Sequence, residues 1–128
     1  MLANSTLQSI ILTSRIAEAE RFYRDVLGLA RRSKSDGALF FRVGETDLCV
    51  APVRSTQPTE HTVLGFAVPD VDKTISWLGD RGIEFERFDG FPHEPNAALL
   101  TPDGARVAWF RDPDGNLLSV VQYPRKDY

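Results

Sequence analysis

Few side chains in this sequence have the chemistry of a catalyst. It contains two histidines, His61 and His93, and a single cysteine, Cys49. A reactive thiolate needs a nearby base or positive charge, but the neighbours of Cys49 are the apolar residues Leu48 and Val50. We therefore interpret the cysteine as a small buried residue. No Ser/His/Asp spacing indicates a hydrolase, and no glycine-rich loop follows a strand to hold a phosphate.

The second histidine has an acidic neighbour, Glu94, in a proline-flanked stretch that reads as a loop. Adjacent residues of a strand point to opposite faces of a sheet, whereas in a loop two neighbouring side chains can converge. His93 therefore stays open to three interpretations. It rebuilds a metal or acid–base site with Glu94 or His61, it lies at the rim of a ligand pocket as a hydrogen-bonding residue, or it is a solvated loop histidine.

Composition narrows the class of protein. The chain has 128 residues, 42% of them hydrophobic and 26% charged, which is typical of one globular domain. One cysteine allows no intramolecular disulfide and no cysteine-rich zinc site. Basic residues are scattered along a chain of net charge −3, so we expect no nucleic-acid binding. No apolar run is long enough to cross a bilayer and the N-terminus lacks the features of a signal peptide, so we expect a cytoplasmic protein without a membrane partner.

The hydrophobic pattern predicts the same series of elements twice. In the first series a strand precedes a helix that begins near Ile16 and ends at Gly28, and two further strands follow; the strands are residues 7–13, 38–43 and 48–51. The second series repeats this order around a helix that Asp70 caps and Gly82 closes, with predicted strands at residues 63–68, 83–85, 106–111 and 116–123.

The two series coincide by count, which indicates an internal duplication. Gln8 and Val63 are 55 residues apart, and so are Ile16 and Val71. We predict an α+β fold with two tandem βαβββ modules, which form a curved mixed sheet with a concave cavity. The chain is then one domain over residues 1–128, with module one at about 7–52, a linker at 53–61, module two at about 62–123 and a loose tail at 124–128.

Three stretches resemble the vicinal oxygen chelate superfamily, which includes glyoxalase I, extradiol dioxygenases and bleomycin-resistance proteins. They are Glu20-Arg21-Phe22-Tyr23-Arg24-Asp25-Val26-Leu27-Gly28-Leu29, Val68-Pro69-Asp70-Val71 and Asp112-Pro113-Asp114-Gly115-Asn116-Leu117. The resemblance covers about residues 7–123. It implies the fold but says little about a reaction, because function lies in sites built onto folds.

The resemblance also implies where a metal ion would be held. Metal-using members of this family take one ligand from the first strand and one from the last strand of each module. Those positions fall on Gln8, on Cys49 or Ala51, on Val63 and on Ser119. Only the Gln8 carbonyl oxygen is a plausible ligand for a divalent ion, so we expect the metal site to be absent and no cofactor to be bound.

Strand alternation predicts which side chains face the cavity. The candidate ligand-pocket residues are Gln8, Ile10, Cys49, Val63, Gly65, His93, Trp109, Phe110, Ser119 and Val121. This set is mostly small or apolar, with a few polar groups, which suits a largely apolar ligand. Trp109 and Phe110 are adjacent in a strand, so they cannot both point into the cavity.

Two functions of different classes follow. The first is a bleomycin-resistance-like protein that binds a small, largely apolar organic molecule without a metal. The alternative is an enzyme of small molecules, isomerase, lyase or dioxygenase-like, with a rebuilt metal site or metal-free acid–base chemistry. A concave face that serves protein association is a third possibility. The resemblance also implies a homodimer, while catalytic residues and the ligand's identity stay unassigned.

Overall fold

The computed structural model describes residues 1–124, and the expected tail at 124–128 otherwise lies outside the described residues. The chain divides into two compact units at Pro58 and Thr59, within the stretch expected to be a linker. We call them the first half and the second half and describe each separately.

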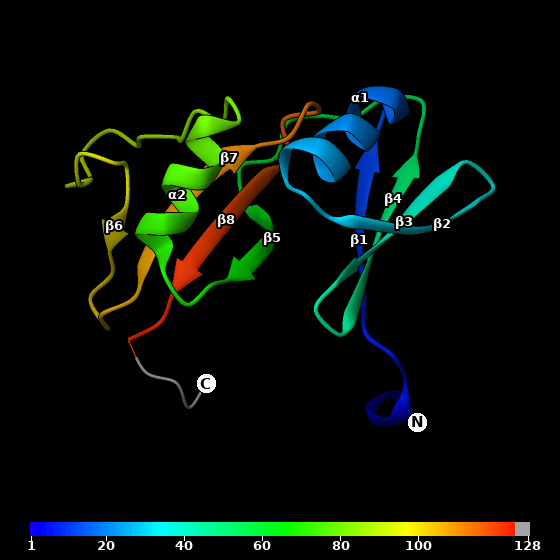
Figure 1. The fold of residues 1–128 in the computed structure, drawn as a ribbon, viewed down its shortest axis with the longest axis horizontal. Coiled ribbons are helices and arrows are strands. Elements are labelled where there is room, and N and C mark those ends of the chain that lie inside the picture. The colour runs from blue at the N-terminus through cyan, green and yellow to red at the C-terminus, as the bar shows by residue number, and fades with distance from the viewer. Residues whose placement is uncertain (125–128) are drawn as a thin grey trace. The chain divides into compact units, whose positions relative to one another are not determined.

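The first half is a four-stranded mixed sheet with one helical segment (Figure 1). Its strand order is β1-β4-β3-β2, in which β1 and β4 are parallel and the other neighbours antiparallel. The elements are the short 3₁₀ helix η1 (Leu2–Asn4), β1 (Gln8–Thr13), α1 (Ile16–Arg21), the π-helix η2 (Phe22–Val26), β2 (Ala30–Ser35), β3 (Ala38–Val43) and β4 (Thr46–Pro52).

The second half repeats this connectivity. Its sheet has the order β5-β8-β7-β6, again with the first two strands parallel. The elements are β5 (Thr62–Ala67), α2 (Val71–Asp80), β6 (Leu99–Leu100), β7 (Arg106–Arg111) and β8 (Leu117–Gln122). The α+β class and the doubled βαβββ module are therefore confirmed, and each module has its own four-stranded sheet.

The helix ends follow from local sequence. The carboxylate of Asp70 accepts a hydrogen bond from the backbone N–H of Lys73 at 3.1 Å, as an N-cap does. Gly28 has a φ of 75°, and the N–H of Leu29 reaches back to the carbonyl of Tyr23 at 3.0 Å. The prediction of a single α-helix from Ile16 to Gly28 was wrong, because the π-helix η2 replaces the second half of that helix. Periodicity over five residues cannot distinguish the two helix types.

One face of each sheet is covered by its helical segment. In the first half the buried side chains Ile11, Leu39 and Val50 share the face on which Tyr23 of η2 meets Phe41 at 6.1 Å between ring centroids. In the second half the side chain of Gln122 accepts a hydrogen bond from the N–H of Val71, at the start of α2. We call the opposite face of each sheet its open face.

Two less regular segments differ from the predicted strands: one strand was missed and one predicted strand is absent. No strand was assigned to residues 30–35, where β2 lies fully exposed at the sheet edge and lacks an apolar alternation. A strand was expected at 83–85, but this stretch is not a strand. Glu86 donates one backbone hydrogen bond to Trp109, and Phe85 packs edge-to-face on Phe110. A half-buried apolar side chain can therefore pack beside a sheet without its backbone joining the sheet.

Within residues 1–124, no helix is long and apolar enough to cross a membrane.

Candidate functional site

The open face of the second half is built around one row of residues on three adjacent strands. Gly65 of β5 pairs with Ser119 of β8, which pairs in turn with Trp109 of β7. Directly paired residues point to the same face of a sheet, so Ser119 and Trp109 are neighbours there. A Cβ atom added to Gly65 would lie 3.1 Å from Oγ of Ser119. The missing side chain of Gly65 therefore leaves the space beside this hydroxyl open.

Ser119 is the polar centre of this row. Its exposed fraction is only 7%, and its side chain makes no hydrogen bond with the described residues. The hydroxyl oxygen itself is not enclosed, because among the described residues Asp47 Oδ1 is the one enclosed side-chain oxygen without a partner. The Ser119 hydroxyl is thus a donor and acceptor available to a molecule that lies on the open face.

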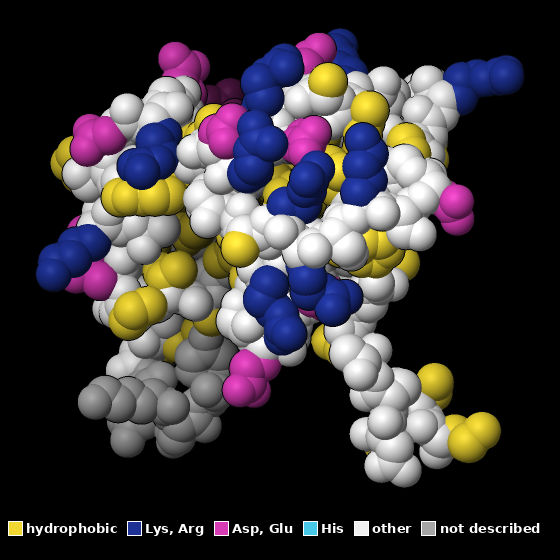
Figure 2. All heavy atoms as spheres, turned by 45° about the vertical axis from the view of Figure 1, so that its right-hand side comes forward, with side chains coloured by type: hydrophobic (Ala, Val, Ile, Leu, Met, Phe, Trp, Pro, Cys, Tyr) yellow, Lys and Arg dark blue, Asp and Glu magenta, His cyan; other side chains and the backbone are white. Residues whose placement is uncertain are grey.

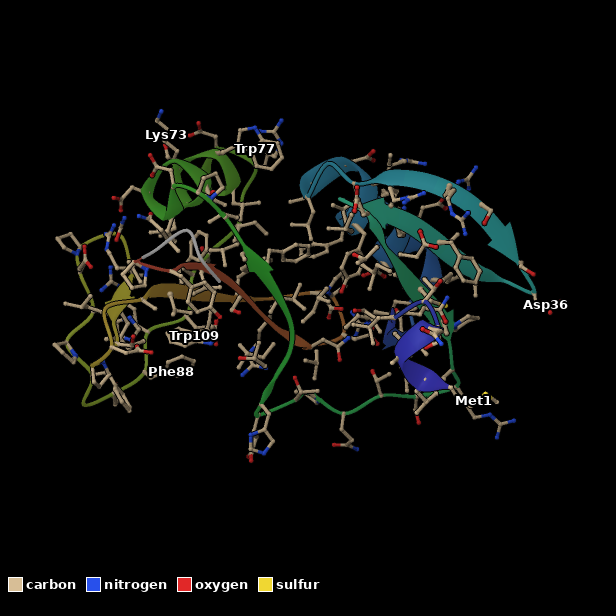
Figure 3. All side chains as sticks on the ribbon, turned by 90° about the horizontal axis from the view of Figure 1, so that it is seen from below. Met1, Asp36, Lys73, Trp77, Phe88 and Trp109 are labelled. Atoms are coloured by element: carbon tan, nitrogen blue, oxygen red, sulfur yellow. The ribbon has the colours of Figure 1, made fainter. Side chains whose placement is uncertain are left out.

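Aromatic rings gather at one end of the row. The ring of Phe88 meets Trp109 edge-to-face at 5.4 Å between centroids, and His93 meets Trp109 in the same way at 6.5 Å. Figure 3 shows Phe88 beside Trp109, with Trp77 separately on α2. The indole N–H of Trp109 donates to Oγ1 of Thr62 at 3.1 Å, which fixes the orientation of the ring. We call Trp109, Phe88 and His93 the aromatic corner.

His93 is a structural residue of this corner. Its Nε2 accepts a hydrogen bond from the N–H of Phe88 at 3.0 Å, and its Nδ1 lies 2.7 Å from the carbonyl oxygen of Ala97. Nδ1 is therefore the protonated nitrogen and both ring nitrogens are used. The interpretation of His93 as a solvated loop histidine was wrong, because the loop folds around the ring. Since neither nitrogen is free, His93 offers no general base.

The neighbouring candidates for a rebuilt metal or acid–base site are also separated. The carboxylate of Glu94 binds the guanidinium of Arg106 at 2.7 Å. This pair lies on the helix face, the sheet face that α2 covers, where Arg106 also binds Asp72 of α2 at 2.8 Å. These hydrogen bonds hold the pKa of Asp72 at about 2 and raise the pKa of Arg106. His61 is exposed ahead of β5. Within the part of the chain that the structure describes, no three His, Cys, Asp or Glu side chains gather to hold a metal ion.

The strands β5, β7 and β8 place one charged side chain on the open face of the second half, Arg111. Its Nε donates to the carboxylate of Glu86 at 3.2 Å, and its Nη1 donates to the carbonyls of Thr59 and Gly115 at 2.8 and 2.7 Å. The guanidinium is thus neutralised by Glu86 and anchored by the backbone. The one positive charge that these strands place on the open face is therefore compensated by Glu86, which lies outside the strands.

The remaining second-half candidates divide between the two faces. Val121 follows the parity of Ser119 and lies on the open face. Val63 is 44% exposed and stands where the register shifts between Thr62 and Leu64, so strand alternation does not assign it to a face. Phe110 is 1% exposed and packs on Phe85 on the helix face. Its inclusion among the pocket residues was wrong, because strand alternation turns it away from Trp109.

The first-half candidates Gln8, Ile10 and Cys49 share the open face of their sheet. Gln8 pairs with Asp47, and Ile10 pairs with Cys49. Ile10 precedes Gly65 by 55 residues, and Gly65 pairs with Ser119, so Cys49 is the counterpart of Ser119. The register therefore assigns the second metal-ligand position to Cys49, and Ala51 is excluded.

Asp47 is an additional charged residue on this face. Its Oδ1 is buried and accepts no hydrogen bond within the described residues. Nη2 of Arg32 lies 3.1 Å from Oδ2, and Nε of Arg42 lies 3.7 Å from Oδ1. Two guanidinium groups beside one carboxylate make this end of the face unfavourable for a cation.

The residues at the four family positions do not fit a divalent metal ion. Gln8 offers a neutral amide oxygen, and burial raises the pKa of the Cys49 thiol, which disfavours the thiolate that a metal would need. Val63 has no donor atom. Ser119 has a hydroxyl without a neighbouring carboxylate among its register partners. This donor set cannot replace the hydration shell of a hard cation.

Sequence reasoning missed three residues of these faces: Asp47, Glu86 and Phe88. Asp47 is paired with Gln8 by the strand register, which was uncertain from sequence. Phe88 and Glu86 lie in the irregular stretch after α2, where no period predicts which face a side chain reaches. The one available signal was the aromatic spacing of Phe85, Phe88 and Phe91 before the histidine.

Comparisons with known proteins agree with the fold. The chain is 32% identical over 132 residues to the "Uncharacterized protein YraH" of Bacillus subtilis (strain 168), across 91% of this chain and 96% of that protein. A superfamily member from Sphaerobacter thermophilus DSM 20745 superposes with a TM-score of 0.75 at 20% identity, over 95% of this chain and 99% of that one. A lactoylglutathione lyase from Agrobacterium tumefaciens gives 0.70 at 22% identity, over 93% of both chains.

At these identities the two solved structures establish the fold alone. The family model described as "Glyoxalase/Bleomycin resistance protein/Dioxygenase superfamily" matches residues 5–120, which is most of the chain. The protein belongs to the glyoxalase, bleomycin resistance protein and dioxygenase superfamily.

Proposed function

We propose that this protein binds a small, largely apolar organic molecule on the open faces of its sheets without a metal ion. The observation that carries the proposal is the set of side chains at the four family metal positions, Gln8, Cys49, Val63 and Ser119. They retain the small, uncharged character of a binding surface and lack the donors of a metal centre.

The environment of the histidines supports binding over catalysis. An acid–base enzyme needs a titratable group that is free to exchange a proton with its substrate. On the second half's open face, His93 uses both nitrogens in the loop and Glu86 is paired with Arg111. The aromatic corner and the Ser119 hydroxyl offer stacking and one hydrogen bond, which favour binding and need no proton exchange.

A thermal-shift screen of small apolar compounds in the presence of EDTA tests this function. We expect at least one compound to raise the melting temperature, by about 5–10 °C at a hundred times its dissociation constant. The shift should disappear in Trp109→Leu and persist in the matched variant Trp77→Leu on α2. Stabilisation that requires an added divalent metal would favour the enzymatic alternative. A panel without a stabilising compound, or a shift that Trp109→Leu leaves intact, would contradict the proposal.

We also propose that two copies of the chain associate, in the cytoplasm. Apolar side chains on the first half's open face are unusually exposed, Ile10 by 57% and Leu12 by 48%. Residues 1–58 carry eight basic and six acidic side chains, a net charge of +2, whereas residues 59–128 carry seven and twelve, a net charge of −5. Figure 2 shows basic side chains gathered on the side that it brings forward. Opposite charges favour contact between the first half of one copy and the second half of another.

Light scattering during gel filtration tests this association. We expect a dimer that weakens as ionic strength rises, because charge attraction is screened by salt. The double variant Ile10→Glu, Leu12→Glu should be monomeric, while Ala17→Glu on the exposed side of α1 should leave the dimer intact. A wild-type monomer at micromolar concentration would disprove the dimer.

A further inference from the structure

The chemistry around Ser119 restricts the kind of molecule that the second half can hold. A ligand on this face meets Gly65, Ser119 and Trp109 in one row, bordered by Phe88 and His93. We infer that this face takes an uncharged, flat aromatic molecule, with its ring at the aromatic corner and its one hydrogen-bonding group on the Ser119 hydroxyl. The inference rests on the proposed function and names the ligand class for the same site.

The flat shape follows from Gly65 and the aromatic corner. Gly65 has no side chain, so the surface between β5 and Ser119 lies level with the backbone, and a Cβ there would come within 3.1 Å of the hydroxyl. A flat ring at the aromatic corner can therefore place its polar substituent in this open space, against the Ser119 hydroxyl. Aromatic pairs gain about 0.5–1.5 kcal/mol beyond the burial of their area, so a ring is preferred to an aliphatic group of equal size.

The ligand is expected to make one hydrogen bond because the other polar groups near this face already have partners. The indole N–H of Trp109 is bonded to Thr62, and both nitrogens of His93 are bonded to the backbone of their own loop. The exposed fraction of Ser119 is 7%, and its hydroxyl has no hydrogen-bond partner among the described residues. One polar group of the ligand can therefore take the place of the water that this hydroxyl contacts.

The expectation that the ligand carries no charge follows from the partners of Arg111. It is the one charged side chain that β5, β7 and β8 place on this face, and Glu86 and two backbone carbonyls already bind it. A carboxylate ligand would compete with Glu86, and an ammonium ligand would find no free carboxylate on these strands. Either charge would lose its hydration without a partner, so a neutral molecule binds best.

Nuclear magnetic resonance of the indole N–H groups tests the inference. The chain has two tryptophans, and Trp77→Phe assigns the Trp109 signal. The probe is 4-methylphenol, titrated in EDTA against toluene, 4-methylcyclohexanol, 4-methylbenzoate and 4-methylbenzylamine. We expect 4-methylphenol to shift the Trp109 signal saturably, with a dissociation constant of about 1–10 mM. Each of the other four should bind about fivefold or more weakly.

The variant Ser119→Ala isolates the hydroxyl. It should weaken 4-methylphenol about fivefold to tenfold, to the level of toluene, and leave toluene unchanged. The matched variant Ser76→Ala, on the exposed side of α2, should change neither. Aliphatic or charged analogues that bind as tightly as 4-methylphenol would overturn the inference, and so would an equal loss for both rings in Ser119→Ala. If no probe moves the Trp109 signal while aliphatic compounds stabilise the protein in EDTA, the inference falls and the proposed function stands.

Discussion

The turn before β8 provides the sharpest stability test, because one buried carboxylate holds it. Asp112 is 6% exposed, and its Oδ1 accepts the backbone N–H groups of Asp114 and Asn116, both at 2.9 Å. Its Oδ2 accepts the side-chain amide of Asn116 at 2.8 Å. Asp112→Ala would leave two buried backbone donors and one amide without these acceptors.

We expect Asp112→Ala to lower the free energy of unfolding of the second half by about 3 kcal/mol, since each buried donor left unpaired costs about 1–3 kcal/mol. With a urea dependence of about 1.5 kcal/mol per molar, the unfolding midpoint should fall by about 2 M. The measurement is Trp109 fluorescence in a Trp77→Phe background, because Trp109 is then the one tryptophan and lies in the second half.

The chain contains its own control in a second Pro-Asp-Gly turn. Asp103 is exposed there, and its carboxylate accepts from the hydroxyl of Thr101. Asp103→Ala makes the same chemical change at the surface, and we expect it to cost less than about 1 kcal/mol. Asp112→Asn keeps the Oδ1 acceptor and should fall between the two. If Asp112→Ala costs no more than Asp103→Ala, the carboxylate does not hold the turn and the reasoning is refuted.

Three further predictions concern charge, reactivity and packing. The folded-state pKa of Asp72 is about 2, below its ordinary 3.8, so its pairing with Arg106 stabilises the protein above pH 3.8 and is lost as the pH falls through 2. Because Asp72 is 55% exposed, solvent screening limits this stabilisation to under about 1 kcal/mol. In urea unfolding, the loss of unfolding free energy caused by Arg106→Met should shrink from pH 5 to pH 2. A loss that stays constant with pH would argue against the pairing. Burial raises the pKa of the Cys49 thiol. Iodoacetamide at pH 8 should therefore alkylate the native protein at least about tenfold more slowly than the urea-unfolded protein, as followed by mass spectrometry. Equal rates would show an exposed thiolate. Gly65→Ala places its Cβ 3.1 Å from Oγ of Ser119. In thermal unfolding, this substitution should therefore cost about 0.5 kcal/mol or more of extra stability in the wild type compared with the Ser119→Ala background. Equal costs in the two backgrounds would mean that the two side chains do not meet.

Much of the fold is encoded locally, and the sequence predicts it for that reason. The cap at Asp70 and the left-handed Gly28 depend on residues a few positions away. The repeat at 55 residues then predicts that the two halves share one connectivity, which the two sheet orders confirm. Alternation along a strand predicts which residues share a face, such as Gln8, Ile10 and Leu12 on β1.

The pairing across each sheet was decided by tertiary structure. The register that places Cys49 opposite Ile10, and Asp47 opposite Gln8, depends on contacts between strands about forty residues apart. A shift of one residue would turn each of those side chains to the other face, and no local pattern in β4 excludes such a shift.

The sequence by itself determined the doubled fold and the poor donor set, because residue types and their spacing suffice for both. Only the tertiary structure decided what His93, Phe88 and Ser119 do. The loop after α2 folds around the imidazole and brings Phe88 to Trp109, and the parallel pairing of β5 with β8 brings Gly65 beside Ser119. These contacts join residues distant in sequence, and their geometry depends on the whole sheet that brings them together.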